Sequence, residues 1–256
     1  MRKTDVLFGT LTFVVLIVVW QILASLGISN LKYLPTPIQV AVGGAQIVGE
    51  ATFWEAVAHT VLVSLWGSAI GCIIGIVAGV VIGLSRTVQN WTLTSIDTFR
   101  AIPIIAILPV MVLIYGLTTQ MELYLIIYGA LWLVLINTIA GVSNVRPLLR
   151  DVSKTLRLGR FMTIGKIILP TAAGPISVGV SLALTHSLVI AVVAEMIGNP
   201  AGVGHEIISS QSALRSDQMF AYIVVTGILG LLFNFGLQRL YRLLRPGLIT
   251  VRGGAR

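Results

Sequence analysis

Charged residues are scarce in this chain, and cysteine is nearly absent. Only 10% of its 256 residues are Asp, Glu, Lys or Arg, whereas 56% are apolar. The mean hydropathy of +0.98 excludes an ordinary soluble domain, whose surface needs far more charge. Because about 20 consecutive apolar residues are enough to cross a bilayer, the composition predicts a polytopic membrane protein.

Groups that carry chemistry are scarce as well. Cys72 is the one cysteine, which excludes a disulfide within the chain, and we interpret it as a small core residue. We find no catalytic set and no group of His, Cys, Asp and Glu at metal-ligand spacing, so neither a metal nor a cofactor is expected. The stretch GRFMTIGKI is not a phosphate-binding loop, because the interval from Gly159 to Gly165 is one residue too long and Ile167 replaces the Ser or Thr. Energy for uphill transport would therefore come from an ion gradient or from another subunit.

Six apolar segments have the length of membrane spans. The first follows Met1-Arg2-Lys3, but its apolar core is too long for a signal peptide and no clear cleavage site follows, so we interpret it as a retained helix. We therefore expect an all-α fold in which residues 1–256 form a single transmembrane domain. The expected spans are about 6–26, 57–84, 98–117, 123–142, 176–197 and 220–241.

The basic residues predict the orientation. If the N-terminus is cytoplasmic, 15 of the 17 Lys and Arg residues fall on the cytoplasmic side, and only Lys32 and Arg215 lie outside. The positive-inside rule then predicts that both termini are cytoplasmic. The net charge of +8 is thus a signal of topology and of contact with anionic headgroups, not of nucleic-acid binding.

The longest cytoplasmic segment, about 143–175, is basic and amphipathic. Val152, Leu156, Phe161 and Ile164 recur at helical spacing. We expect short amphipathic helices that are presented partly to a cytoplasmic partner, closed by Pro170, with the fifth span starting after Gly174-Pro175.

Span 2 carries a ridge of glycines spaced four residues apart. Such small-xxx-small ridges let helix backbones approach closely in lipid. Packing against a helix of the same chain is one interpretation, and a face used in subunit contact or sliding is the other. The ridge consists of Gly67, Gly71, Gly75, Gly79 and Gly83.

A few polar or proline residues inside the spans are candidates for a pathway or gate. His186 is near the middle of span 5, where it either makes a helix–helix hydrogen bond or lines the path. Glu195, at the outer end of that span, either holds the following glycine-rich turn, belongs to a gate, or lies beyond a misplaced span end. We expect His59 at the outer interface and Arg100 at the cytoplasmic one. The candidates are Asn137, Ser181, Thr185, His186, Glu195, Pro103 and Pro109.

The basic segment resembles the cytoplasmic coupling loop, or EAA loop, of permease subunits of ABC importers. That pattern is Glu-Ala-Ala, three residues, Gly, and a run ending in Ile-x-Leu-Pro, and Ile167-Ile168-Leu169-Pro170 matches its end. Counting back thirteen residues from Pro170 puts Arg157 at the glycine position and Asp151-Val152-Ser153 at Glu-Ala-Ala. Family glycines sit at a bend that needs positive φ, so we expect the bend here to be made differently, at Gly159. The coupling residues implied by the resemblance are Asp151, Val152, Ser153, Leu156, Arg157, Gly159, Leu169 and Pro170.

Four other stretches are similar to landmarks of the branch of this family that handles nitrate, sulfonates, taurine, bicarbonate and some aromatic or pyrimidine compounds. They are YLPTPIQV (33–40), RAIPIIAILPV (100–110), LINTIAGV (135–142) and VVAEMIGNPAGVGHEI (192–207). The resemblance covers nearly the whole chain and implies a type I ABC importer permease in a bacterial inner membrane. It also implies cytoplasmic ATP-binding subunits, an extracytoplasmic solute-binding protein and a second permease subunit as partners.

Two other interpretations stay open. An ion-coupled secondary transporter predicts internal repeats and ionisable groups near the midplane, and of these we find only His186. A membrane anchor for a cytoplasmic complex leaves the proline-containing span unexplained. The divergent coupling loop further predicts a second permease of different sequence, with an identical partner as the alternative. Since few charges line the spans, a highly charged cargo would depend on the binding protein or on helix dipoles.

Overall fold

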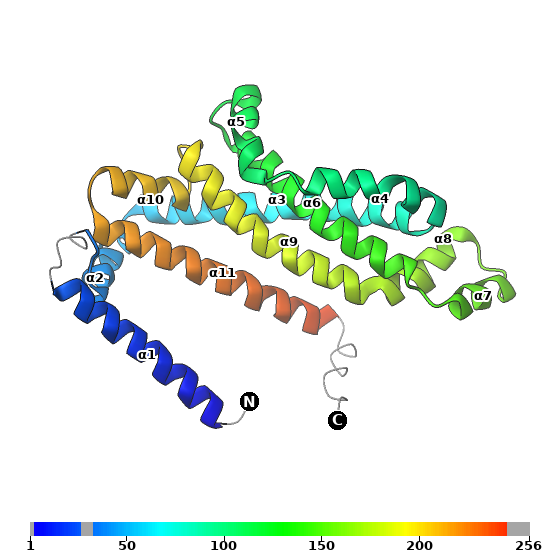
Figure 1. Cartoon of the computed structure of the whole chain (residues 1–256), viewed down its shortest axis with the longest axis horizontal. Helices are drawn as coiled ribbons and strands as arrows, with labels where there is room; N and C mark the ends of the chain where they lie inside the picture. The colour runs from blue at the N-terminus through cyan, green and yellow to red at the C-terminus, as the bar shows by residue number, and fades with distance from the viewer. Residues whose placement is uncertain (1–2, 27–32, 245–256) are drawn as a thin grey trace.

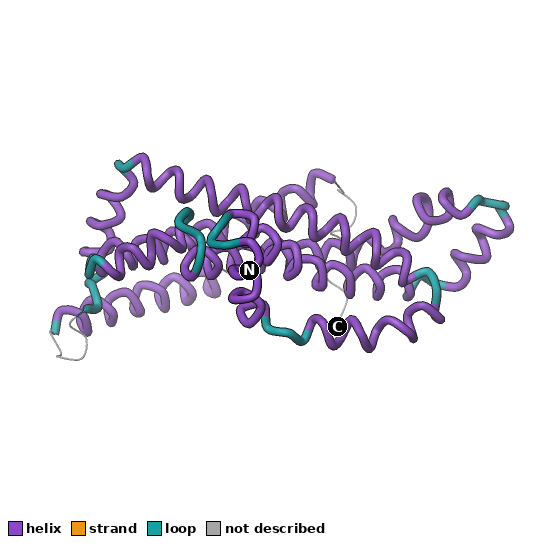
Figure 2. The backbone as a smooth tube through the Cα atoms, turned by 90° about the horizontal axis from the view of Figure 1, so that it is seen from above, coloured by secondary structure: helices purple, strands orange, loops and turns teal. Residues whose placement is uncertain are grey.

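The computed structural model describes residues 3–26 and 33–244, and these are almost entirely helical, with short loops and no strand (Figure 2). The all-α class is therefore confirmed. The helices are α1 (Lys3–Ser25), α2 (Pro37–Val48), α3 (Ala51–Gly83), α4 (Arg86–Arg100), α5 (Ile104–Tyr115), α6 (Thr119–Ser143), α7 (Pro147–Thr155), α8 (Arg160–Thr163), the π-helical turn η2 (Ile164–Ile168), α9 (Leu169–Ile197), α10 (Val203–Ser212) and α11 (Ser216–Leu244).

Three long helices, α3, α6 and α9, form the centre of an elongated bundle (Figure 1). α11 packs along α9, and α4 lies beside α3 and α6. α2 and α10 gather at one end of the bundle, which we call the α10 end, whereas α7 and α8 lie at the opposite, α7 end. α1 contacts α2 and then extends away from the bundle, and α5 projects from its side.

The glycine ridge of α3 packs directly on α6 of the same chain. A Cβ on Gly67 would lie 2.5 Å from Cγ2 of Ile126, and one on Gly79 would lie 2.6 Å from Cβ of Thr138. Real Cβ atoms do not approach so closely, so glycine is required for this helix separation. The close approach supplies dispersion contacts, which hold helices together where apolar surface gains nothing by leaving lipid.

Four helical segments are long and apolar enough to cross a bilayer: α3, α6, the continuous helix Arg160–Ile197, and Ser216–Leu237 of α11. The pair α4 and α5 is bent by 80° and makes a fifth if it is counted as one span. α1 coincides with the first expected span, but the apolar part found in it is the shorter Val14–Ser25. The described residues thus support four or five spans, and the sixth is not established.

The expected span 98–117 is not one helix. α4 already begins at Arg86, after the cap Ser85 whose hydroxyl accepts a hydrogen bond from the N–H of Val88 at 3.4 Å. It ends at Arg100, because Pro103 disfavours helical backbone in the residue before it and has no N–H to donate. Residues 86–97, which we expected in a cytoplasmic loop, therefore belong to a helix that packs along the bundle.

The expected start of the fifth span after Gly174-Pro175 is also wrong. The helix is continuous from Arg160 through Ile197, and Pro170 lies inside it. A π-helical turn at Ile164–Ile168 precedes this proline, and the Thr171 hydroxyl donates to the carbonyl oxygen of Ile167 at 2.6 Å. The widened turn and the hydroxyl replace regular backbone bonding where Pro170 has no N–H, as π-turns and Thr side chains do near prolines.

Candidate functional site

The Glu195 carboxyl group joins three segments at the α10 end. Its Oε1 accepts a hydrogen bond from the Thr60 hydroxyl at 2.7 Å, and its Oε2 accepts one from the Gly204 N–H at 2.8 Å. Thr60 Oγ1 in turn accepts a bond from the Val203 N–H at 2.9 Å. Glu195 is only 1% exposed, and a Cβ on Gly202, which has φ of +93°, would collide with its carboxyl group. The carboxyl group therefore ties α3 and α9 to the turn that starts α10.

A second network lies beside the first. Glu122 Oε2 is 3.1 Å from Nε2 of His59 and accepts a hydrogen bond from Nδ2 of Asn199 at 2.7 Å. Glu122 is fully buried, because α6 already begins at Thr119. The expected spans 98–117 and 123–142 had left it in the outer loop between them. His59 is part-buried against this carboxyl group instead of facing the interface.

The two networks also bring together a group with metal-ligand chemistry, which sequence spacing did not predict. One ligand atom each from His59, Glu122 and Glu195 lies within 4.8 Å of the others. Nε2 of His59, Oε2 of Glu122 and both carboxyl oxygens of Glu195 already have hydrogen-bond partners, whereas the buried Oε1 of Glu122 has none. We therefore interpret the group as a hydrogen-bonded tie between α3, α6 and α9.

A cavity of about 450 Å³ lies at the break between α4 and α5, and charged side chains line it. Arg100 Nε lies 2.9 Å from Oδ1 of Asp97, and the two side chains are 50% and 58% exposed. His186 of α9 contributes to the wall of this cavity and also to that of a smaller one of about 230 Å³, which Ile104 lines as well. His186 therefore lies where the two cavities share a wall.

Aromatic contacts set the depth of the larger cavity. The Tyr128 hydroxyl donates to the Phe99 carbonyl oxygen at 2.7 Å, and Phe99 stacks on Trp132 with ring centroids 6.2 Å apart. Tyr128 is near the middle of α6, about 14 Å from one end and about 22 Å from the other at 1.5 Å per residue. Arg100 follows Phe99, so it lies near mid-depth and not at the cytoplasmic end as expected. A charge there costs about 2.5–3.5 kcal/mol on insertion scales unless it is paired or lines a water-filled cavity.

The other predicted pathway residues are placed differently. Asn137 donates to the Leu133 carbonyl, Ser181 to that of Ser177, and Thr185 to that of Ser181. Such bonds to the preceding helical turn satisfy each polar group locally. Pro103 lines the smaller cavity and caps the start of α5, and Pro109 lies within α5. Of the seven candidates, His186 alone lines the cavity that holds the charged pair.

The coupling segment forms a helical hairpin at the α7 end (Figure 1). α7 exposes Asp151 and Val152 and buries Ser153, and Leu156, directly after α7, is exposed as well. Its base is fixed by a buried apolar cluster of Val142, Val145, Ile168 and Ala172, which comes from α6, α9 and the connections between them. Leu169 and Pro170 begin α9 and therefore lie in the helix on which the hairpin is mounted.

The bend after α7 is made at Arg157, so the expectation that it moves to Gly159 is wrong. Arg157 has φ of +48°, whereas Gly159 has φ of −62°. The Leu158 N–H donates to the Ser153 carbonyl oxygen at 2.9 Å, which is the bond that closes a Schellman motif around a left-handed residue. Arginine thus takes the conformation for which glycine is best suited, at a cost of about 1–2 kcal/mol.

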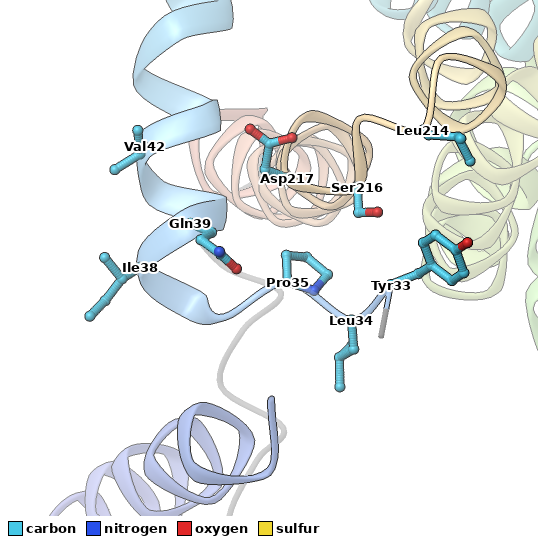
Figure 3. Close-up of a pocket in the computed structure, with 9 residues that line it drawn as sticks. All are labelled: Tyr33, Leu34, Pro35, Ile38, Gln39, Val42, Leu214, Ser216 and Asp217. Atoms are coloured by element: carbon cyan, nitrogen blue, oxygen red, sulfur yellow. The ribbon is translucent and has the colours of Figure 1, made fainter. Parts of the chain in front are cut away.

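The motif YLPTPIQV forms the start of α2. The Thr36 hydroxyl accepts a bond from the Gln39 N–H at 3.2 Å, while Gln39 Oε1 accepts one from the Thr36 N–H at 2.8 Å, a capping box. The motif lines a pocket of about 390 Å³. Pro35 and Gln39 lie toward Asp217 at the start of α11, whereas Tyr33 lies toward Leu214 (Figure 3). The motif therefore builds part of the surface at the α10 end.

Sequence reasoning missed the depth of the Asp97–Arg100 pair and the burial of Glu122. The first had a usable signal, because residues 86–100 are strongly amphipathic and end just before a proline that stops the helix. The second had none, since the partners of Glu122 lie 63 and 77 residues away along the chain.

Comparisons with known proteins agree with this geometry. Residues 71–250 match the family described as binding-protein-dependent transport system inner membrane component. The taurine transport system permease protein TauC of Escherichia coli is 30% identical over 250 residues, covering 96% of this chain and 90% of that protein. The putative aliphatic sulfonates transport permease protein SsuC of Bacillus subtilis is 28% identical, covering 91% and 85%. The nitrate import permease protein NrtB of Leptolyngbya laminosa is 27% identical, covering 88% and 82%.

Solved structures share the fold. An inward-facing structure of the MetNI methionine ABC transporter superposes with a TM-score of 0.67 at 19% identity, covering 77% of this chain and 99% of that one. An amino acid ABC transporter gives a TM-score of 0.61 at 15% identity, covering 78% and 95%. Of the two transporter alternatives, the ATP-driven one is supported and the ion-coupled one is not. The chain therefore belongs to the family of inner-membrane components of binding-protein-dependent transport systems, on the branch of ABC importer permeases that includes the sulfonate, taurine and nitrate proteins.

Proposed function

We propose that this chain pairs with a second permease subunit to form the pathway of an importer for a small solute such as an organic sulfonate, taurine or nitrate. In this proposal the α10 end faces outward and receives the solute from a binding protein, and the α7 end faces the cytoplasm. Both termini are then cytoplasmic. Arg86, Arg146 and Arg160 would lie on the inner side, which agrees with the positive-inside rule. Arg2, Arg245, Arg252 and Arg256 lie outside the described part of the chain.

The coupling hairpin is the observation that carries this proposal. Its inner side is fixed by the apolar cluster at the base of α6 and α9, so a force on α7 is transmitted to spans that line the cavities. Its outer side exposes Leu148, Val152 and Leu156, which are the apolar contacts that a groove on a cytoplasmic ATPase would cover. Basic neighbours such as Arg157 and Arg160 can pair with acidic groups on that partner.

The side of the bundle supports a second permease subunit. α5 projects away from the bundle and exposes Ile105, Leu113 and Ile114 (Figure 1). Both cavities lie beside α5, so a subunit packed there would close them from lipid and leave a shared path. In our proposal this subunit either has the same sequence or carries the regular coupling pattern that this chain lacks.

Co-purification with the ATPase tests the proposal. The permease is expressed with candidate ATPase and binding-protein subunits, and Leu148, Val152 and Leu156 are replaced together by Ser. We expect the ATPase to be lost while the permease remains folded, because contacts on a hydrophobic docking face are removed. The matched control replaces exposed Leu214, at the α10 end, by Ser and should retain the ATPase. Equal ATPase retention by both variants would contradict the coupling assignment.

A further inference from the structure

We propose that Arg100 and Asp97 form a transient oxyanion-binding subsite midway across the membrane, in which a small monovalent oxyanion replaces Asp97 on the Arg100 guanidinium. The inference rests on the proposed function, since it names the chemistry by which that pathway handles its solute. It assigns the specificity-determining contact to the last residue of α4, a helix of which residues 86–97 were expected in a cytoplasmic loop.

The geometry of the pair leaves room for a ligand. Asp97 Oδ1 contacts Nε at one edge of the guanidinium, at 2.9 Å. A guanidinium carries five N–H donors in a planar fork, more than one carboxylate can use, and this fork matches the oxygens of a sulfonate or nitrate group. Both side chains are about half exposed, and both line the cavity. Neither is therefore fixed in the protein interior.

The walls of the cavity suit a small oxyanion with an organic group. His186 reaches it from α9, and a neutral or a protonated imidazole always offers at least one N–H donor. Tyr128 and Trp132 supply aromatic surface. The volume of about 450 Å³ lies in the range of small-molecule sites. Lipid headgroups do not reach this subsite, because Tyr128 sets it about 14 Å from the nearer end of α6.

Asp97 gives the subsite its transient character. An arginine alone at this depth would hold an anion tightly and slow its release. Asp97 is three residues earlier on the same helix and competes for the same guanidinium, so it returns to Arg100 when the anion leaves. Its negative charge also disfavours divalent anions, which would bring two further negative charges beside it. The subsite is thus suited to passage and not to storage.

The test uses the complete transporter, with its ATPase and binding protein, in proteoliposomes. The labelled probes are taurine, methanesulfonate and nitrate. Arg100→Gln should lower the maximal uptake rate of the carried probe by about 10- to 100-fold, which is the loss of one charge-assisted hydrogen bond. Arg100→Lys, which keeps the charge but not the fork, should fall between Arg100→Gln and the unaltered complex. ATP hydrolysis and subunit assembly should not change.

The variant Asp97→Asn distinguishes an anion-binding subsite from an ion pair whose role is only structural. We expect it to lower the KM and the maximal rate together, because the competitor that releases the anion is gone. The control Arg86→Gln removes a charge from the first turn of the same helix, outside the walls of this cavity, and should leave uptake unchanged.

The outcomes are distinguishable. Uptake by Arg100→Gln within twofold of the unaltered complex, or a raised KM in Asp97→Asn, would overturn the subsite while leaving the proposed function intact. If Arg100→Gln fails to fold, the comparison of Arg100→Lys with Asp97→Asn decides by the same criteria. An unaltered complex that carries none of the three probes would overturn the proposed function, and the subsite with it.

Discussion

Replacing Glu195 tests whether its carboxyl group has a structural role or supplies a charge that the pathway needs. In Glu195→Ala the Gly204 N–H loses its acceptor, which costs about 1–3 kcal/mol for a buried donor. Thr60 loses less, because its hydroxyl is also 3.1 Å from the Ala56 carbonyl oxygen and can donate there. The space left by the truncated side chain adds a cavity term, so the free energy of unfolding should fall by about 2–5 kcal/mol in total.

Glu195→Gln should behave differently, because an amide of the same shape can satisfy both neighbours. Its oxygen can accept from the Gly204 N–H, and its NH₂ group can donate to Thr60 Oγ1, while the Thr60 hydroxyl turns to Ala56. We expect a loss below about 1 kcal/mol and near-normal uptake.

The assay is unfolding of the purified chain by SDS titration in mixed micelles, together with uptake by the reconstituted transporter. Exposed Glu55, on the same end of the bundle, provides the control variant Glu55→Ala. A Glu195→Gln protein that is stable but inactive would refute the structural role and assign the charge to a gate. Equal stability of Glu195→Ala and the unaltered protein would refute the tie itself.

Three further predictions concern helix packing, the coupling turn and the assembly. Gly79→Ala should destabilise the chain by about 1–3 kcal/mol through its contact with Thr138, whereas Gly174→Ala, with open space around it, should be neutral or slightly stabilising in the same SDS titration. Arg157→Gly should keep coupled ATP hydrolysis and raise stability by up to about 1 kcal/mol, while Arg157→Val should lower both, since a β-branched residue at φ of +48° is strained. Mass spectrometry of the native complex should find a second permease sequence, and a complex with two copies of this chain and no other permease would contradict that expectation.

The sequence predicted most of what depends on local pattern. The glycines from Gly67 to Gly83 indicated a close helix contact, and the spacing of Val152 and Leu156 indicated a short amphipathic helix. The glycine-rich stretch after Glu195 indicated the turn that starts α10. In each case the residues that carry the signal lie within a few helical turns of one another. Their spacing in the sequence therefore determines how they are arranged in space.

The remainder depended on how distant segments meet. Arg100 was expected at the cytoplasmic interface because it lies near the start of the predicted span 98–117, but Tyr128 of α6 holds the end of α4 near mid-depth. Pro170 looked like a helix end, yet a π-turn lets the helix continue through it. Arg157 looked incompatible with a left-handed turn, yet the hydrogen bonds around it maintain that conformation. Such outcomes are set by tertiary packing, which single-residue preferences do not report.

Cross-linking from the coupling helix tests the central claim most directly, namely that this permease is driven by an ATPase docked on α7. Because Cys72 is the one native cysteine, Cys72→Ser gives a background in which Val152→Cys or Leu214→Cys is the single thiol. Each thiol is labelled with a photoreactive maleimide in membranes that contain the complete transporter. The account predicts that position 152 captures the ATPase and that position 214, at the α10 end, does not. Capture of the ATPase from position 214, or capture of the binding protein from position 152, would contradict it.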